Sequence, residues 1–257
     1  MDLLQAVVLG VVQGLTEFLP ISSSGHLILV PWLLRWDDPG LVFDVALHCG
    51  TLVALVGYFW RTWLRLLLHD WRLLLLLALG SLPGGVVGFL GSGFIEAHFR
   101  HPLQVALALA LFGLLLLWVD RVGSKTRDSA AFTWRDALII GGAQALALLP
   151  GVSRSGITIT AGLLLGFKRE VAATYSFLLA TPITAGAVLW AARRLLHDGI
   201  PPNEQAAFAA GVLSSGVAGA LAIHYLLHFV RTRSYAPFVA YRLVVGGLVG
   251  IVALVRG

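Results

Sequence analysis

Long apolar runs dominate the chain, and short polar segments separate them. A helix needs about 20 apolar residues to cross the roughly 30 Å of hydrocarbon in a bilayer. Six runs meet or approach that length, at residues 41–60, 73–95, 102–119, 171–192, 205–227 and 235–255. The pattern therefore predicts six transmembrane helices.

Two further apolar regions, residues 3–34 and 137–167, are broken in the middle by Pro, Ser and Gly. The breaks lie at residues 20–25 and 150–156, so each half is too short to cross a bilayer. Broken backbone at membrane depth is tolerated only where protein encloses it or it lines a cavity. We therefore expect two re-entrant helical hairpins, each returning to the side from which it entered.

The two breaks are related by a constant offset of 131 residues, which places Gln13, Ser22, Ser24 and Gly25 on Gln144, Ser153, Ser155 and Gly156. The same offset gives seven identities over the sixteen residues 75–90. The chain thus reads as two copies, 1–127 and 130–257, each with one hairpin and three spans. Because three is odd, the second copy must be inverted. The predicted fold class is an all-α polytopic membrane protein with two inverted-topology repeats.

Composition agrees with a membrane protein. Of 257 residues, 58% are hydrophobic and 12% are charged, and the mean hydropathy is +0.87. Soluble domains carry about 25% charged residues. These values exclude an ordinary soluble enzyme and a disordered chain, and a net charge of +5 is too thinly spread for a nucleic-acid binder. The single cysteine, Cys49, excludes an internal disulfide.

Basic residues are distributed unequally between the two predicted sides of the membrane. Eleven fall on the side opposite the N-terminus, and five fall on the N-terminal side, namely Arg35, Arg100, Arg193, Arg194 and Arg256. Cytoplasmic loops carry the excess of Lys and Arg. We therefore expect the side opposite the N-terminus to face the cytoplasm, and the N-terminus and the mouth of the first hairpin to face outward.

Glu17 is the single charged residue between Leu3 and Leu34. Ionisable groups at membrane depth are costly and mark functional sites by default. Gln13 lies one helical turn earlier on the same face, where it can bond Glu17 or complete an oxygen site for a divalent cation. A structural alternative is that Glu17 caps the amides of the following turn.

The turn after Glu17 reads Ser22-Ser23-Ser24-Gly25-His26. Hydroxyls and free amides at the start of a helix suit anion binding. The same serines also suit a plain helix cap. His26 is a candidate acid, base or nucleophile for phosphoryl transfer, and a buried core histidine is the alternative.

Arg154 is the buried charge of the second break. Its guanidinium matches phosphate oxygens in a bidentate manner, and the amides of the next helix add to the same anion site. A Glu17–Arg154 ion pair joining the two breaks is the structural alternative, and both are compatible without ligand. The substrate-binding candidates around these charges are Ser22, Ser24, Gly25, Ser153, Ser155, Gly156 and Thr158.

Other polar residues carry weaker signals. We expect His48, Cys49 and Thr51 to pack between helices, and Arg242 to snorkel or to bind a loop carbonyl. His224 and His228 have the i, i+4 spacing of a metal pair, but no third ligand is evident, so we place them at the membrane interface.

Residues 13–26, QGLTEFLPISSSGH, resemble the first signature of the undecaprenyl-diphosphate phosphatases, also called bacitracin-resistance proteins. Residues 150–159, PGVSRSGITI, resemble the second, and the resemblance covers essentially the whole chain. It implies the same double inverted repeat. It also implies hydrolysis of undecaprenyl diphosphate to undecaprenyl phosphate and inorganic phosphate, which recycles the carrier lipid of cell-wall peptidoglycan synthesis and confers bacitracin resistance.

The resemblance further implies a divalent cation, Mg²⁺ or Ca²⁺. The family's first signature has Glu or Gln, three residues and then Glu, and Gln13 and Glu17 occupy these positions. Gln at the first weakens any mechanism in which both positions supply negative charge. Ser23, His26, Ser153, Arg154 and Thr158 fall on the family's remaining active-site positions.

The sequence leaves the attacking group open between Ser23, His26 and a metal-bound water, and we favour Ser23 assisted by His26. The partners expected are a polyprenyl diphosphate and membrane lipids, with no nucleic acid, and a homo-oligomer stays open. The competing hypothesis is an inverted-repeat secondary transporter or polyprenyl-phosphate flippase, because the predicted architecture serves transport as well.

Overall fold

The computed structural model describes residues 1–256, except for the side chains of residues 92, 96, 191, 194–196 and 198. Arg194, counted above on the outer side, thus has its side chain outside the described residues. The described chain is helical throughout, with one isolated β-bridge between Arg127 and Phe167. Its α-helices are α1 (Leu3–Phe18), α2 (Ser23–Leu34), α3 (Leu41–Tyr58), α4 (Trp60–Leu68), α5 (Trp71–His98), α6 (Pro102–Val122), α7 (Trp134–Ala145), α8 (Arg154–Leu164), α9 (Arg169–Asp198), α10 (Gln205–Phe229) and α11 (Ala236–Arg256).

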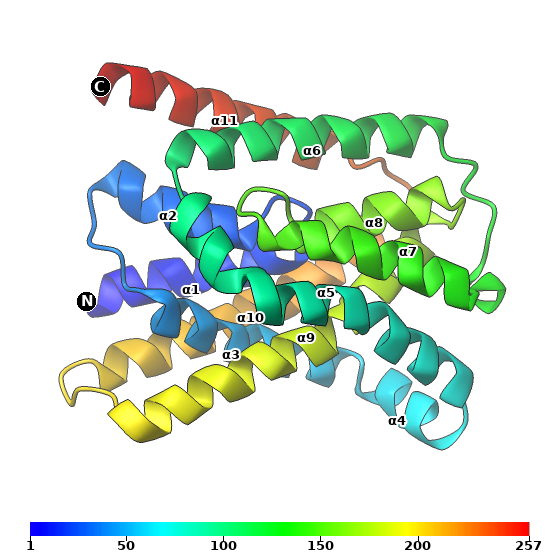
Figure 1. The fold of residues 1–257 in the computed structure, drawn as a ribbon, viewed down its shortest axis with the longest axis horizontal. Coiled ribbons are helices and arrows are strands. Elements are labelled where there is room, and N and C mark those ends of the chain that lie inside the picture. The colour runs from blue at the N-terminus through cyan, green and yellow to red at the C-terminus, as the bar shows by residue number, and fades with distance from the viewer. Residues whose placement is uncertain (257) are drawn as a thin grey trace.

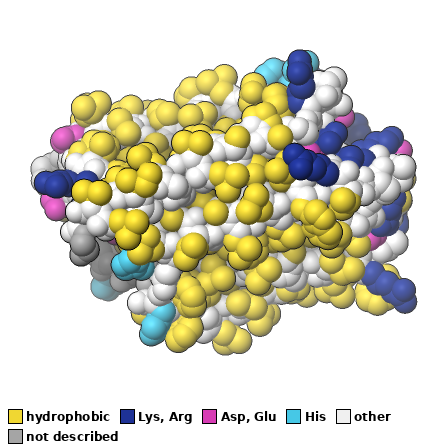
Figure 2. Space-filling model, turned by 90° about the horizontal axis from the view of Figure 1, so that it is seen from above, with side chains coloured by type: hydrophobic (Ala, Val, Ile, Leu, Met, Phe, Trp, Pro, Cys, Tyr) yellow, Lys and Arg dark blue, Asp and Glu magenta, His cyan; other side chains and the backbone are white. Residues whose placement is uncertain are grey.

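Six of these helices, α3, α5, α6, α9, α10 and α11, are long and apolar enough to cross a membrane, with mean hydropathies from 1.5 to 2.3. They coincide with the six predicted spans, which confirms that prediction. Their outward surfaces carry large apolar side chains, such as Phe89 at 88% exposure and Leu254 at 82%. Figure 2 shows such side chains over the middle of the molecule. Contiguous apolar surface of this kind is unsuited to water, so the chain is a multi-pass membrane protein.

Helix α4 was not predicted, because residues 61–72 were left as the connection between the spans 41–60 and 73–95. The helix is short and amphipathic: Leu66 is buried, whereas Trp60 and Leu68 are exposed. Two 3₁₀ turns, η1 (Ser129–Ala131) and η2 (Leu146–Leu148), complete the described elements.

Besides α4, four of the described helices are too short to cross. α1 has 16 residues, α2 has 12, α7 has 12 and α8 has 11. At about 1.5 Å per residue, even α1 reaches only some 24 Å. α1 and α2 are joined by the first turn, residues 19–22, and α7 leads through η2 and the second turn, residues 149–153, into α8. Both interruptions predicted from the sequence are therefore present as breaks between helices.

The first helix of each short pair packs against a long helix from the other half of the chain. α1 packs against α10, and α7 packs against α5. Small residues allow the close approach: a Cβ at Gly10 would overlap the carbonyl oxygen of Gly211, and a Cβ at Gly141 would overlap that of Gly80. The two halves are therefore interleaved and share one core.

The molecule has two ends. Both termini and the α2–α3, α5–α6 and α9–α10 connections lie at the left of Figure 1, and α4 and the α6–α7 connection lie at the right. Ion pairs tie down each end, for example Arg100–Asp38 at 3.0 Å on the left and Arg231–Glu170 at 2.6 Å on the right. The first turn and the second turn meet between these ends (Figure 1).

Candidate active site

The two turns are bonded directly to each other. The amide of Gly151 donates to Ser22 Oγ at 3.1 Å, and the Ser155 hydroxyl donates to the Leu19 carbonyl at 3.1 Å. Ser22 and Ser153 are the N-caps of α2 and α8, and both have positive φ angles, 77° and 74°. A left-handed backbone is rare for residues other than Gly, and such strain is concentrated at functional sites. The turns thus form one rigid unit.

Arg242 of α11 binds the backbone of both turns. The side chain is fully buried and donates to the carbonyls of Pro20 in the first turn and of Gly151 and Val152 in the second, at 3.2, 2.9 and 3.1 Å. It also binds Leu109 on α6. Of the two possibilities raised from the sequence, the structure confirms the bond to loop carbonyls.

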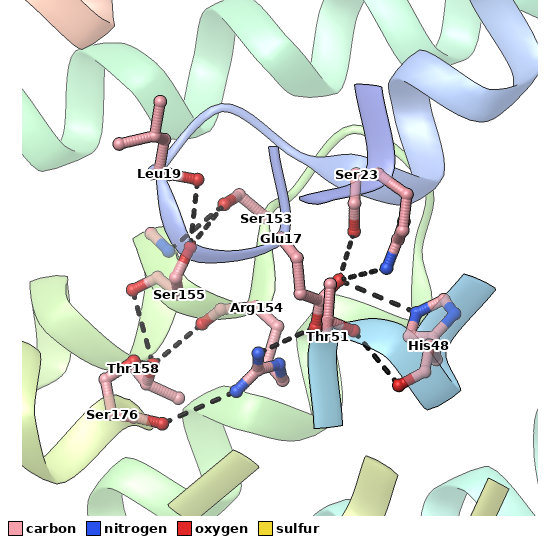
Figure 3. Close-up of polar contacts among 12 residues, drawn as sticks. Glu17, Leu19, Ser23, His48, Thr51, Ser153, Arg154, Ser155, Thr158 and Ser176 are labelled. Atoms are coloured by element: carbon pink, nitrogen blue, oxygen red, sulfur yellow. Dashed lines mark hydrogen bonds and ion pairs between the residues drawn. The ribbon is translucent and has the colours of Figure 1, made fainter. Parts of the chain in front are cut away.

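Glu17 lies at the end of α1, where the first turn begins, and is 6% exposed. Its Oε1 accepts from the Arg154 guanidinium at 2.7 Å. Its Oε2 accepts from Ser23 Oγ at 2.6 Å and from Gln13 Nε2 at 3.1 Å, and lies 3.5 Å from His48 Nε2. Figure 3 shows Ser23, Arg154 and His48 converging on this carboxylate. The ion pair considered as an alternative is therefore present in the ligand-free protein.

A cavity of about 170 Å³ opens beside this cluster. Its lining includes the polar side chains of Glu17, Ser23 and Arg154 and the apolar side chains of Ala147, Leu148, Ile183 and Ala187. The remaining lining residues are Ser22, Ser24, His48, Gly84, Gln144, Ser153 and Thr184. A charged head group with an apolar tail suits a cavity with such a mixed lining.

Comparison with known proteins identifies the lineage. The family described as bacitracin resistance protein BacA matches residues 6–248. The chain belongs to the BacA family. It is 51% identical to "Undecaprenyl-diphosphatase" of Moorella thermoacetica, with 100% of both chains covered, and 50% identical to the protein of that name from Geotalea daltonii, with 96% and 97% covered. It is 48% identical to "Undecaprenyl-diphosphatase 2" of Stutzerimonas stutzeri, again with 96% and 97% covered.

In this BacA-family chain, the structure brings some of the predicted site residues together and separates others. Gln13, Glu17, Ser23 and Arg154 are joined in one hydrogen-bonded cluster. Of these four, Glu17, Ser23 and Arg154 line the cavity, together with Ser22, Ser24 and Ser153. The remaining substrate-binding candidates, Gly25, Ser155, Gly156 and Thr158, do not line the cavity.

Those four residues shape the turns instead. Ser155 bonds the first turn, and Thr158 donates to the Arg154 carbonyl at 2.7 Å and pairs with Ser176 Oγ at 2.7 Å. A Cβ at Gly25 would approach Gly151 to 3.4 Å, and one at Gly156 would approach Arg242 to 3.1 Å. Both glycines therefore keep the turns close.

The expected assistance of Ser23 by His26 is not present in this geometry. His26 Nδ1 bonds the Ser22 carbonyl at 2.7 Å, and Nε2 bonds the Tyr241 hydroxyl at 2.9 Å, so both ring nitrogens are engaged. His26 is 4% exposed, and it stacks on Tyr241 at 5.6 Å between ring centroids. The ring points to α11, and Ser23 bonds Glu17 in its place.

The placement of His48 is also corrected. We expected His48 to pack between helices, but it lines the cavity, and its Nδ1 bonds the Asp44 carbonyl at 2.8 Å. This bond makes Nδ1 the donor and turns Nε2 toward Glu17. Gln144 and Thr184 also line the cavity and were not proposed from the sequence, although the repeat offset had already matched Gln144 to Gln13.

Proposed function

We propose that this BacA-family protein hydrolyses undecaprenyl diphosphate to undecaprenyl phosphate and inorganic phosphate. The reaction recycles the carrier lipid for cell-wall synthesis and confers bacitracin resistance. The observation that carries the proposal is the Glu17–Ser23–Arg154 cluster at a cavity lined by both polar and apolar residues, in a chain about half identical to proteins named undecaprenyl-diphosphatase.

The diphosphate group would lie against the polar lining residues Glu17, Ser23 and Arg154. Arg154 lines the cavity and offers a planar fork of donors that suits phosphate oxygens. Helix geometry leaves the first amides of α2 and α8 without carbonyl partners, and both helix starts point their partial positive charge at the meeting of the turns. These groups offset the negative charge that builds up as the leaving phosphate departs.

The Ser23 hydroxyl is the proposed nucleophile and Glu17 its base, because the hydroxyl already donates to the carboxylate at 2.6 Å. Ser23 Oγ attacks the terminal phosphorus, its proton passes to Glu17, and the bond from that phosphorus to the bridging oxygen breaks. The electron pair leaves on undecaprenyl phosphate. Water then hydrolyses the phosphoserine and releases inorganic phosphate.

Trapping separates this route from the alternatives left open by the sequence. Rapid quenching with substrate labelled in the terminal phosphate should place label on Ser23, and Ser23→Ala should carry none. Label on His26 would assign the attack to that residue. Turnover without any labelled protein would assign it to water activated by Glu17.

The site also suits the divalent cation, Mg²⁺ or Ca²⁺, that we propose as a cofactor. Gln13 Oε1 is buried beside Glu17 and has no hydrogen-bond partner among the described residues. The described residues include no cluster of three His, Cys, Asp or Glu ligands. Mg²⁺ commonly uses one or two carboxylates together with substrate phosphates. Gln13 and Glu17 would hold the cation, which when bound neutralises phosphate charge.

We further propose that the halves 1–127 and 130–257 are inverted repeats whose short helix pairs are re-entrant hairpins. Three observations support this. The paired helices are too short to cross, α1 and α7 start from opposite ends of the molecule, and the contacts Gly10–Gly211 and Gly141–Gly80 are related by the offset of 131 (Figure 1). Lys and Arg side chains gather at the right of Figure 2, at the end that holds α4 and the α6–α7 connection. This basic end would face the cytoplasm, across the inner membrane from the N-terminus.

Phosphate release by the purified protein tests the function. In detergent, with Mg²⁺ or Ca²⁺ and no ion gradient, it should release inorganic phosphate from undecaprenyl diphosphate. Glu17→Gln should abolish release, whereas Glu204→Gln, at a partly buried pair with the N-terminus that does not line the cavity, should not change it. Lipid movement across vesicles without phosphate release would establish the transporter instead.

A further inference from the structure

Gln144 is a buried amide without partners. The side chain is 3% exposed, and neither its Oε1 nor its Nε2 has a hydrogen-bond partner among the described residues. It lines the same cavity as Glu17 and Arg154. An unpaired buried amide destabilises a fold, so a polar group that is kept in this state needs another explanation.

The two halves explain why Gln144 lacks a partner. In the first half, Gln13 donates to Glu17 at 3.1 Å, four residues later. The offset of 131 places Gln144 at the position of Gln13 and Leu148 at the position of Glu17. Both Glu17 and Leu148 line the cavity. The second half thus keeps the amide and replaces its carboxylate with an apolar residue, which leaves the Gln144 amide available to a ligand.

The surroundings of Gln144 indicate which part of a ligand it meets. A Cβ at Gly84 would lie 3.3 Å from Gln144 Nε2 and 3.0 Å from the side chain of Ile183. Ile183 and Leu148 are apolar residues of the cavity lining. Gln144 is therefore a polar group beside apolar lining residues, in a cavity that Glu17 and Arg154 also line. In a diphosphate lipid, the phosphate next to the apolar tail suits such a position.

We propose that Gln144 Nε2 donates a hydrogen bond to the phosphate that is joined to the polyprenyl chain. Arg154 and the amides of the turns then hold the terminal phosphate, which is transferred. This assignment rests on the proposed function. Gln144 would then be a substrate-binding residue that selects a lipid-linked phosphate. It would act beside Glu17, Ser23 and Arg154, which break the phosphoanhydride bond.

Binding of the two products to Gln144→Met tests the assignment. Met has nearly the shape of Gln but lacks the donor. The dissociation constant for undecaprenyl phosphate should rise by about 10- to 100-fold, the range for a hydrogen bond to a charged group. Binding of inorganic phosphate should stay within about twofold, because that probe reports the other phosphate position. Gln104→Met, at an exposed glutamine of α6, should bind both products as the wild type does.

Unchanged binding of undecaprenyl phosphate, equal weakening of both products, or the same effect in Gln104→Met would overturn the assignment. Binding requires no turnover, so failure of the phosphatase assay remains a separate result. Gln144→Glu keeps the shape and adds a negative charge, and it should weaken lipid phosphate binding at least as much. Wild-type binding in Gln144→Glu would mean that the side chain holds a cation.

The melting temperature of Gln144→Met separates a substrate-binding role of Gln144 from a structural one. Gln144→Met removes two unpaired buried polar atoms, so the melting temperature of the ligand-free protein should equal or exceed that of the wild type. A lower melting temperature would show that Gln144 supports the fold, and would also overturn the assignment.

Discussion

At the residue scale, the Glu17 carboxylate is the point on which the site depends. It holds Arg154 on one oxygen and Ser23 on the other, so a single side chain contacts both the proposed phosphate-binding group and the proposed nucleophile. A diphosphate entering the cavity competes with Glu17 for the guanidinium. Release of Arg154 to the substrate would therefore also free the carboxylate to accept a proton.

Arg154 provides the first prediction. Arg154→Ala should lower kcat/KM by about 10²- to 10³-fold, because one positioned donor for the transition state is lost. Arg154→Lys should recover only part of this loss, since a lysine keeps the charge but lacks the planar fork. Phosphate release from undecaprenyl diphosphate measures both. Arg231→Ala, at an exposed ion pair with Glu170, is the matched control, and wild-type activity in Arg154→Ala would contradict the proposed role.

The residues of the site were predictable from the sequence to different degrees. Glu17 and Arg154 were found because charge is scarce in apolar sequence, so their placement carried information. His48 was missed because α3 reaches α1 only through tertiary packing, which no local pattern records. The repeat offset matched Gln144 to Gln13, but the sequence does not show that the Gln144 amide is buried without a partner and lines the cavity.

At the element scale, the breaks in the short helices follow from local chemistry. Pro20 and Pro150 stop the preceding helices, and Ser22 and Ser153 cap the following ones, so the positions of both turns could be predicted. The hydrogen bonds from Arg242 to the turns could not be predicted. Arg242 lies more than 200 residues from the first turn, in a helix whose sequence resembles an ordinary span.

Arg242→Met tests whether these hydrogen bonds stabilise the fold. The substitution leaves the carbonyls of Pro20, Gly151 and Val152 without their donor in the protein interior. At about 1–3 kcal/mol for each unpaired buried group, the loss should reach at least about 3 kcal/mol. That corresponds to a fall on the order of 10 °C in melting temperature.

Arg256→Met on the same helix is the control, because Arg256 makes its contacts at an exposed position, with the carbonyls of Trp32 and Leu33 and with the face of the Trp32 ring. Its melting temperature should stay within about 2 °C of the wild type. Equal melting temperatures for Arg242→Met and the wild type would show that the turns hold together without the arginine.

At the scale of the whole molecule, the two halves are joined at the basic end by a cluster around Asp136, at the start of α7. Arg127 donates to both carboxylate oxygens, at 3.0 and 2.8 Å, and also to the Leu165 carbonyl at 2.9 Å. The boundary between the halves was predicted at residues 127–130. The contact between Arg127 and Leu165, the residue after α8, could not be predicted, because the two residues are 38 positions apart.

Stability should depend on the ionisation of Asp136. Burial raises the pKa of this carboxyl, but hydrogen bonds from Arg127 and Thr133 outweigh burial and hold the pKa below its ordinary value of 3.8. Because the folded-state pKa lies below the unfolded one, the stabilisation is complete above about pH 4–5 and is lost as the pH falls further. Asp136→Asn should therefore melt several degrees below the wild type at pH 7, and the gap should narrow toward pH 3. A gap that is independent of pH would contradict this.

The inverted repeat makes a prediction about positions related by the offset of 131. In parallel repeats such positions lie on the same side of the membrane, and in inverted repeats they lie on opposite sides. Asp37, in the α2–α3 connection, corresponds to Lys168, in the α8–α9 connection, and both are exposed. Single cysteines at these positions, in a Cys49→Ser background, report the side of each.

In intact cells whose outer membrane admits the reagent, a membrane-impermeant maleimide should label Asp37→Cys, because the basic end of the molecule is expected in the cytoplasm. Lys168→Cys should react only after the inner membrane is opened, and a permeant maleimide should label both, which excludes buried thiols as the cause. Labelling of both positions in intact cells would refute the inversion. Labelling of Lys168→Cys alone would preserve the inversion and reverse the orientation, and the active-site mouth predicted to open outward would then belong to the second hairpin.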